Sequence, residues 1–433
     1  MIPLFLFPLA LAPAALQQPE PGQRGMTLDD AVRTAQANAF AVQRAEADVE
    51  RAKGARRQAI AQTLPNLTFD ATYTRFTNDV TVQFDPMQPP IVVRPIDRSN
   101  LSLNLRQAVD VSGIFGWGIR GARAQVDATE ALLHAAMNNV ALDAKVAFFN
   151  VFVAHELVGV ADERVANAQE ALRVANVRFE AGVVPRFDVL RFESELKAAE
   201  QERIQAGNGL ALAKASFNHT LSRDTGAPVS LVPPDTVPQD PPALETLLET
   251  AKSARPEVLA AQHALTLQES IRRARERQLL PELNITATVS RDPQARGFGS
   301  ERDTVSATAV LSVPIFDSGR VRSVVDQAKQ DEEQARIALE QVRLGVELEV
   351  RQAWLDVVAA KEAVETAAKG VEFAREAHRL AQVRYSGGVG TPLEVSDATV
   401  SLARARASHV TALYDYWKAY ARLQRAVGKE ELP

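Results

Sequence analysis

The chain has 433 residues, and 49 Lys and Arg against 54 Asp and Glu give it a formal net charge of −5. With 46% hydrophobic and 24% charged residues, it has the composition of a folded protein and not of a disordered one. The slight acidic excess argues against a nucleic-acid partner, which normally requires a basic surface. Cysteine is absent from the sequence, which excludes disulfides, thiolate metal sites and a cysteine nucleophile.

The N-terminus has the features of an export signal. Residues 2–16 read IPLFLFPLALAPAAL, an apolar run that is too short and too rich in proline to span a membrane as a helix. Ala12-Pro13-Ala14 fits the small-residue pattern of a cleavage site, although no Lys or Arg precedes the run. We therefore expect residues 1–14 to be a signal peptide. The sequence has no other stretch of 18 apolar residues, so contact with a membrane is expected through β-strands or at the surface.

An internal repeat organises the rest of the chain. Residues 27–75 match residues 243–291 at an offset of 216, and from residue 112 onward the two copies match at an offset of 206. The sequence therefore predicts a first structural repeat over residues 15–223 and a second over residues 243–433. The connecting segment, 224–242, is rich in proline and is expected to be an extended linker, because proline removes a helical hydrogen bond.

Each repeat is expected to consist of a helix, a set of strands and a long helical hairpin. The expected ranges are a helix over 28–63, strands over about 66–111 and a hairpin over 113–223 in the first repeat, then a helix from 243, strands over about 282–314 and a hairpin over 319–428 in the second. Residues 114–180 and 320–386 contain no proline, so each predicts a helix of roughly 100 Å. Apolar residues with heptad-like spacing along these helices favour coiled-coil packing.

The strand segments alternate apolar and small polar residues, as in Leu67, Phe69, Ala71 and Tyr73 against the residues between them. This pattern is typical of a half-buried antiparallel sheet in a soluble domain. It is equally typical of a membrane barrel with a lipid-facing wall and a wet interior. The strands alone do not separate the two interpretations, and the export signal favours the barrel. The segment of about 76–98 is expected to be a long, proline-rich external loop.

The chemistry of an enzyme is not visible in the sequence. It contains no phosphate-binding glycine loop and no Ser/His/Asp pattern, and its six histidines are scattered without a pair at metal-binding spacing. We therefore expect no catalytic, cofactor-binding or metal-binding residues.

Two similar turns connect the helices of each hairpin. They read RFEAGVVPRFDVLRFESEL and RYSGGVGTPLEVSDATVSL, starting at Arg178 and Arg384. With the duplicated helix and strand pattern around them, they resemble the outer-membrane efflux protein family, the TolC-like channels. The resemblance covers almost the whole mature chain.

The resemblance implies a mainly α fold with a membrane β-barrel portion. In that family a homotrimer shares one barrel of twelve strands, four per chain, continuous with an α-helical tunnel across the periplasm. Oligomerisation itself follows from the sequence, because four strands cannot close a barrel and open edges are not tolerated in lipid. The implied function is a passive conduit through outer-membrane lipid, opened by a periplasmic adaptor protein and powered by an inner-membrane pump. The alternative is a soluble periplasmic coiled-coil scaffold; the sequence does not specify the cargo.

The resemblance also assigns roles at the turns. The rim that contacts the adaptor corresponds to Gly182, Val183, Gly387, Gly388 and Val389, and the periplasmic constriction to Asp188, Tyr385, Glu394 and Asp397. The alternative role of these carboxylates is to cap the helices, because anions favour a helix N-terminus. Some members of the family carry an arginine where this chain has Gly390, so the resemblance does not extend to a salt-bridge latch that uses this arginine. We expect the closed state to rest on a hydrogen bond between Tyr385 and Asp188 and on helix packing.

Overall fold

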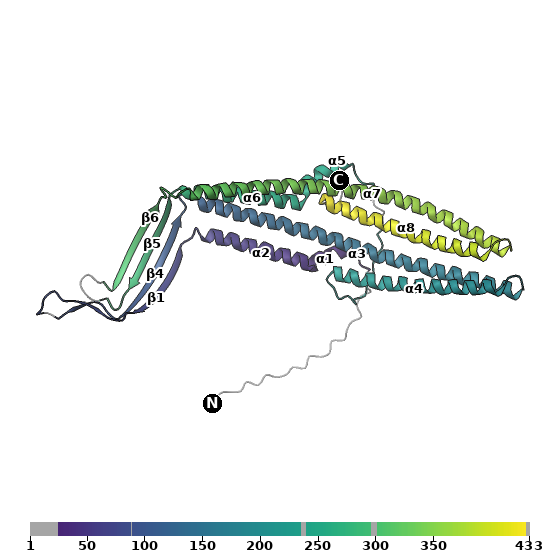
Figure 1. Ribbon diagram of the computed structural model, residues 1–433, viewed down its shortest axis with the longest axis horizontal. Helices are drawn as coiled ribbons and strands as arrows, with labels where there is room; N and C mark the ends of the chain where they lie inside the picture. Colours follow the sequence, from purple (N-terminus) through teal and green to yellow (C-terminus); the bar gives the residue numbers. More distant parts are fainter. Residues whose placement is uncertain (1–24, 88, 235–239, 296–300, 430–433) are drawn as a thin grey trace, which may run out of the picture.

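The computed structural model describes residues 25–87, 89–234, 240–295 and 301–429, so the expected signal peptide lies outside the described residues. The molecule is elongated, with a β-sheet at one end and helices running away from it (Figure 1). In chain order the elements are α1 (Leu28–Asn38), α2 (Phe40–Ala61), β1 (Asn66–Arg75), β2 (Val80–Val82), β3 (Ile91–Arg94), β4 (Asp97–Val109), α3 (Ile114–Glu180), α4 (Arg186–Thr220), α5 (Leu244–Ala254), α6 (Pro256–Glu276), the 3₁₀ turn η1 (Arg277–Leu279), β5 (Glu282–Arg291), β6 (Asp303–Ser312), α7 (Arg320–Ser386) and α8 (Pro392–Val427).

The two repeats have matching elements. α3 and α7 each contain 67 residues and begin 206 residues apart, at Ile114 and Arg320. Each begins after a glycine in the left-handed region, Gly113 with φ 72° and Gly319 with φ 82°. β1 and β5 each contain 10 residues and begin 216 residues apart. The offsets read from the sequence therefore hold in three dimensions.

Two details differ from the sequence expectation. The single helix expected over 28–63 is interrupted at Ala39, which is extended with φ −63° and ψ 128°. The second repeat is interrupted at the matching position, Arg255, where the following Pro256 disfavours a helical conformation. The expected external loop also contains regular structure, because β2 and β3 pair as a separate antiparallel hairpin.

The main sheet has the strand order β1-β4-β5-β6, and all neighbours are antiparallel. β4 and β5, which come from different repeats, lie side by side in its centre, with Leu105 opposite Ala287. β1 and β6 are the edges, and within the described residues neither has a second partner in this sheet. The chain therefore ends its sheet with two free backbone edges.

The helical part has its core where both repeats meet. Phe148 of α3 packs on Phe217 of α4 with ring centroids 6.3 Å apart, and Phe149 packs on Trp417 of α8 at 5.3 Å. Among the described residues, α3 is the one helix that is long and apolar enough to span a membrane. Because Phe148 and Phe149 are fully buried between helices, these apolar residues of α3 build the protein core.

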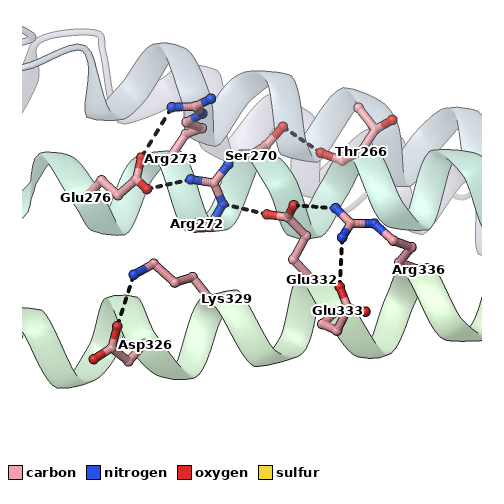
Figure 2. Close-up of polar contacts among 10 residues, drawn as sticks. All are labelled: Thr266, Ser270, Arg272, Arg273, Glu276, Asp326, Lys329, Glu332, Glu333 and Arg336. Atoms are coloured by element: carbon pink, nitrogen blue, oxygen red, sulfur yellow. Dashed lines mark hydrogen bonds and ion pairs between the residues drawn. The ribbon is translucent and has the colours of Figure 1, made fainter.

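Charged side chains fix α6 against α7 close to the sheet. Figure 2 shows Arg272 of α6 reaching Glu332 of α7 as well as Glu276 of its own helix. Glu332 also accepts a hydrogen bond from Arg336 at 3.3 Å. Arg272 and Glu332 are only 17% and 12% exposed, so water screens this pair less than a surface pair. The cluster holds the N-terminal part of α7 against α6, close to the sheet.

Candidate gate and docking tips

Both hairpins turn through the same backbone geometry. Gly182 and Gly388 have φ values of 72° and 82°. Residues other than glycine adopt this left-handed conformation only at a cost in free energy. The residue after each glycine donates its backbone N–H to a carbonyl one turn earlier, Val183 to Arg178 at 2.8 Å and Val389 to Arg384 at 3.0 Å. This is the usual way in which glycine ends a helix. The two valines are exposed, at 62% and 73%.

The structure brings the two turns together into one tip cluster. Its buried members are Ala175, Val189 and Phe192 from the first hairpin and Ala381, Tyr385 and Val395 from the second. The rings of Phe192 and Tyr385 lie 5.7 Å apart. The tips therefore have a common apolar core, and the residues expected to dock an adaptor surround it on the exposed side.

Tyr385 occupies the centre of this cluster and differs from the expectation. Its side chain is 4% exposed, and its hydroxyl is buried with no hydrogen-bond partner among the described residues. The hydrogen bond expected from Tyr385 to Asp188 is therefore not formed in the single chain. Burial raises the pKa of Tyr385, the Arg178 guanidinium opposes this shift through its charge and its contact with the side chain, and the Asp188 charge adds to it. Asp188 is close enough to act through its charge, but it does not bond the hydroxyl.

Arg178 connects the two hairpins instead. Its guanidinium donates to the backbone carbonyl of Tyr385 and lies 4.7 Å from the centre of the tyrosine ring. No role for Arg178 was predicted from the sequence, although it lies in the Val-Arg-aromatic motif that is repeated before each turn. The matching Arg384 stays within its own hairpin, with Nε 3.5 Å from a Glu394 oxygen.

The acidic residues after the second turn are not the helix cap. The cap of α8 is Thr391, whose hydroxyl accepts the backbone N–H of Glu394 at 3.3 Å. Glu394 and Asp397 are both exposed and lie three residues apart on α8, hence on one face of it. In α4 the N-cap residue, Pro185, makes no side-chain cap, and Asp188 lies in the first turn. Glu394 and Asp397 thus face solvent at the tip, whereas Asp188 is half-buried.

The turn also explains the glycine at position 390. A Cβ atom there would lie 2.8 Å from the backbone nitrogen of Tyr385 and 3.0 Å from Arg384. No side chain fits without a backbone shift, so an arginine at this position is incompatible with this turn. Arg178 and Arg384 supply the guanidinium groups of the tip from other positions.

The apolar face of the sheet is uncovered. Leu67, Phe69 and Tyr73 are 61%, 67% and 62% exposed, and no described helix packs on the sheet. The opposite face carries hydroxyl and amide groups that bond one another across strands, such as Thr288 to Asn104 at 2.8 Å. A soluble scaffold would bury the apolar face, so this arrangement favours the barrel wall.

Comparison with known proteins decides the family. The model of the outer membrane efflux protein family matches residues 31–219 and 247–429, which is one segment in each repeat. The chain belongs to this family. The predicted fold, a mainly α protein with a β portion, is confirmed. The protein is located in the outer membrane and extends into the periplasm.

Individual relatives agree with this result. Protein CyaE of Bordetella pertussis is 27% identical over 69% of this chain and 64% of its own length, and TolC of Escherichia coli is 24% identical over 66% and 61%. The aligned part thus spans less than two thirds of both relatives. Among solved structures, the outer membrane protein VceC of Vibrio cholerae has a TM-score of 0.78 at 18% identity and covers 93% of this chain and 96% of its own. The alignment with the structure of CusC covers 98% of this chain and 99% of CusC, with a TM-score of 0.79 at 18% identity. These similarities show a common fold.

Proposed function

We propose that three copies of this chain close a twelve-stranded barrel continuous with an α-helical tunnel, and that the assembly is a passive conduit from periplasm to exterior. The observation that carries the proposal is the four-stranded sheet with two free edges and an uncovered apolar face. Unpaired backbone groups and open edges are not stable in hydrocarbon, so neighbouring copies have to pair with β1 and β6. Four strands per chain and a total of twelve then require three copies.

The conduit performs no chemistry of its own in this proposal and needs no cofactor. A periplasmic adaptor contacts the exposed turns at Gly182, Val183 and 387–389, and an inner-membrane pump supplies the energy. Relatives named for alkaline protease secretion and for pyoverdine export both match this chain. Since such different cargoes pass through proteins of one family, we propose that the pump and adaptor select the cargo.

The tip cluster is the proposed gate. In the closed state its apolar core and Arg178 hold the two hairpins together, and Asp188, Glu394 and Asp397 place carboxylates around the opening. Repetition in each copy makes rings of negative charge, which attract cations. Opening then requires the two hairpins of one copy to separate at Tyr385.

The proposal is tested by the mass and conductance of the protein extracted from membranes. The protein–detergent complex should contain three chains, resist extraction by alkaline carbonate, and conduct ions in a planar bilayer. A folded monomer in the soluble fraction would instead support the coiled-coil scaffold and reject the conduit.

A further inference from the structure

The apolar face of the sheet ends in charged residues at the end that lies far from the helices (Figure 1). Directly opposite residues of neighbouring strands lie on one face of a sheet, so the strand register gives rows of side chains across it. One row is entirely apolar and consists of Phe69, Leu103, Val289 and Val305. The next row away from the helices ends in Arg291 opposite Asp303, and two rows further out Arg75 lies opposite Asp97. These four charged residues form the outer border of the apolar face.

The two arginines of the outer border keep N–H donors available. The Nε atom of Arg75 lies 3.8 Å from an Asp97 oxygen, and that of Arg291 lies 3.6 Å from an Asp303 oxygen, which is too long for a hydrogen bond. The same Asp97 oxygen accepts the hydroxyl of Tyr73 at 2.6 Å. Both arginine side chains are exposed, at 71% and 66%. Neither guanidinium is therefore committed to its carboxylate neighbour.

An arginine on the opposite face, at the same end of the sheet, is held differently. Arg98 of β4 donates from Nε to Asp292, which follows β5, at 2.7 Å. Asp292 is only 13% exposed, so this pair is shielded from water. Arg98 thus joins β4 to the segment after β5, whereas the arginines on the apolar face are free to bind a ligand.

We infer that Arg75 and Arg291 bind the phosphate groups of glycolipids in the outer leaflet of the outer membrane. This inference rests on the proposed barrel wall and adds a ligand at its outer border. Lipids of that leaflet carry phosphate groups on their sugar headgroups, next to their acyl chains. A planar guanidinium gives two parallel hydrogen bonds to a phosphate. The sheet therefore offers donors for the phosphate beside an apolar surface for the acyl chains.

The carboxylates of the outer border favour a lipid over a dissolved phosphate ion. Asp97 and Asp303 cancel the charge of the two arginines and repel a free anion. A lipid is held by its acyl chains as well, and its phosphate then lies within reach of a guanidinium that has five N–H donors. Tyr73 is 62% exposed and directs its hydroxyl to Asp97, an arrangement typical of aromatic residues at the level of the headgroups.

Binding of diphosphorylated lipid A to delipidated protein in detergent tests the inference. Native mass spectrometry should show lipid A on the assembled natural protein. Arg75→Gln and Arg291→Gln should each weaken binding about tenfold, because each removes charged hydrogen bonds to a phosphate. Arg106→Gln is the matched control, since Arg106 is exposed on the opposite face, where it lies opposite Thr286. It should leave lipid binding unchanged, and an equal loss in this control would overturn the assignment.

Two further probes show which part of the lipid is recognised, and they use the natural protein alone. Dephosphorylated lipid A should bind far more weakly than the diphosphorylated form, and excess inorganic phosphate should displace little of the bound lipid. Equal binding of both lipids would mean that the acyl chains alone are recognised. Full displacement by inorganic phosphate would mean a general anion site. Either result overturns the inference.

Mass and conductance of the same samples separate the lipid site from the proposed function. An assembled, conducting protein that binds lipid A independently of Arg75 and Arg291 overturns the inference and leaves the conduit intact. A natural protein that forms only monomers rejects the conduit, and the lipid site at its outer border with it.

Discussion

At the scale of single residues, the contact between the two hairpin turns depends on Arg178 more than on the hydroxyl of Tyr385. Arg178→Ala removes a charged hydrogen bond and a cation–π contact, together about 2 kcal/mol per copy. We expect a higher open probability in single-channel recordings. Tyr385→Phe should leave conductance unchanged, because it removes only an unpaired hydroxyl. A large effect of Tyr385→Phe with none of Arg178→Ala would reverse the two roles.

His378 makes the second hairpin sensitive to pH. It is 7% exposed in the seam of α7, its Nε2 atom has no described partner, and burial lowers its pKa from the ordinary 6.5. Above the pKa of the unfolded state, His378 is neutral in both the folded and the unfolded protein, so the full stability is present there. Stability is then lost as the pH falls through about 6.5 towards the lower folded value.

The matching residue of the first hairpin is Leu172, which gives a natural replacement. Thermal unfolding between pH 8 and pH 5 should show a smaller loss of stability at acid pH for His378→Leu than for the natural protein. Carboxylates contribute equally to both proteins, so the difference isolates His378. Parallel pH profiles would show that folding does not lower the pKa of His378.

At the scale of elements, the turns are defined by two left-handed glycines. Nothing lies within 4 Å of a Cβ built on Gly182, so a substitution there adds backbone strain without a clash. Gly182→Val should cost about 1–2 kcal/mol locally and reduce adaptor-dependent efflux, with assembly unaffected. Gly182→Asn is the matched control, since asparagine tolerates this conformation, and should retain more efflux. Efflux at the level of the natural protein in both variants would place adaptor docking away from this turn.

The start of α8 separates capping from ion selection, because different residues perform them. Thr391→Ala removes the side-chain cap and should destabilise the helix by about 1 kcal/mol while leaving ion selectivity intact. Glu394→Ala with Asp397→Ala should lower the cation-to-anion permeability ratio and leave thermal stability nearly unchanged. Permeability ratios and melting temperatures measured on both variants decide the question. An unchanged ratio in the double variant would remove these carboxylates from the gate.

At the scale of the whole molecule, a charged cluster joins helices from both ends of the second repeat. Arg255 is 3% exposed and donates to the carbonyls of Arg425 and Ala426, both at 3.0 Å, and to Glu349 at 2.8 Å. Arg255→Ala removes the hydrogen bonds to both carbonyls, while Glu349 keeps its ion pair with Arg425, and should cost about 2–3 kcal/mol, measured by thermal unfolding. Lys252→Ala nearby breaks only a surface pair and should cost less than about 1 kcal/mol.

The sequence by itself determined the features that depend on near neighbours in the chain. Helical and strand periodicity, the two repeat offsets, the glycine turns and the start of α8 at Thr391-Pro392 all follow from local conformational preferences. The break before Pro256 has a local cause as well. The matching break at Ala39 has none, because no proline follows it, and only its alignment with Arg255 marks the position.

The tertiary structure decided everything that joins distant residues. It places Arg178 on Tyr385, which is 207 residues away, and leaves the Tyr385 hydroxyl unpaired, where the family resemblance predicted a bond to Asp188. It also pairs β4 with β5 and so leaves β1 and β6 as the free edges. Such contacts depend on how two long hairpins pack, since side chains far apart in sequence become neighbours only when their helices lie side by side.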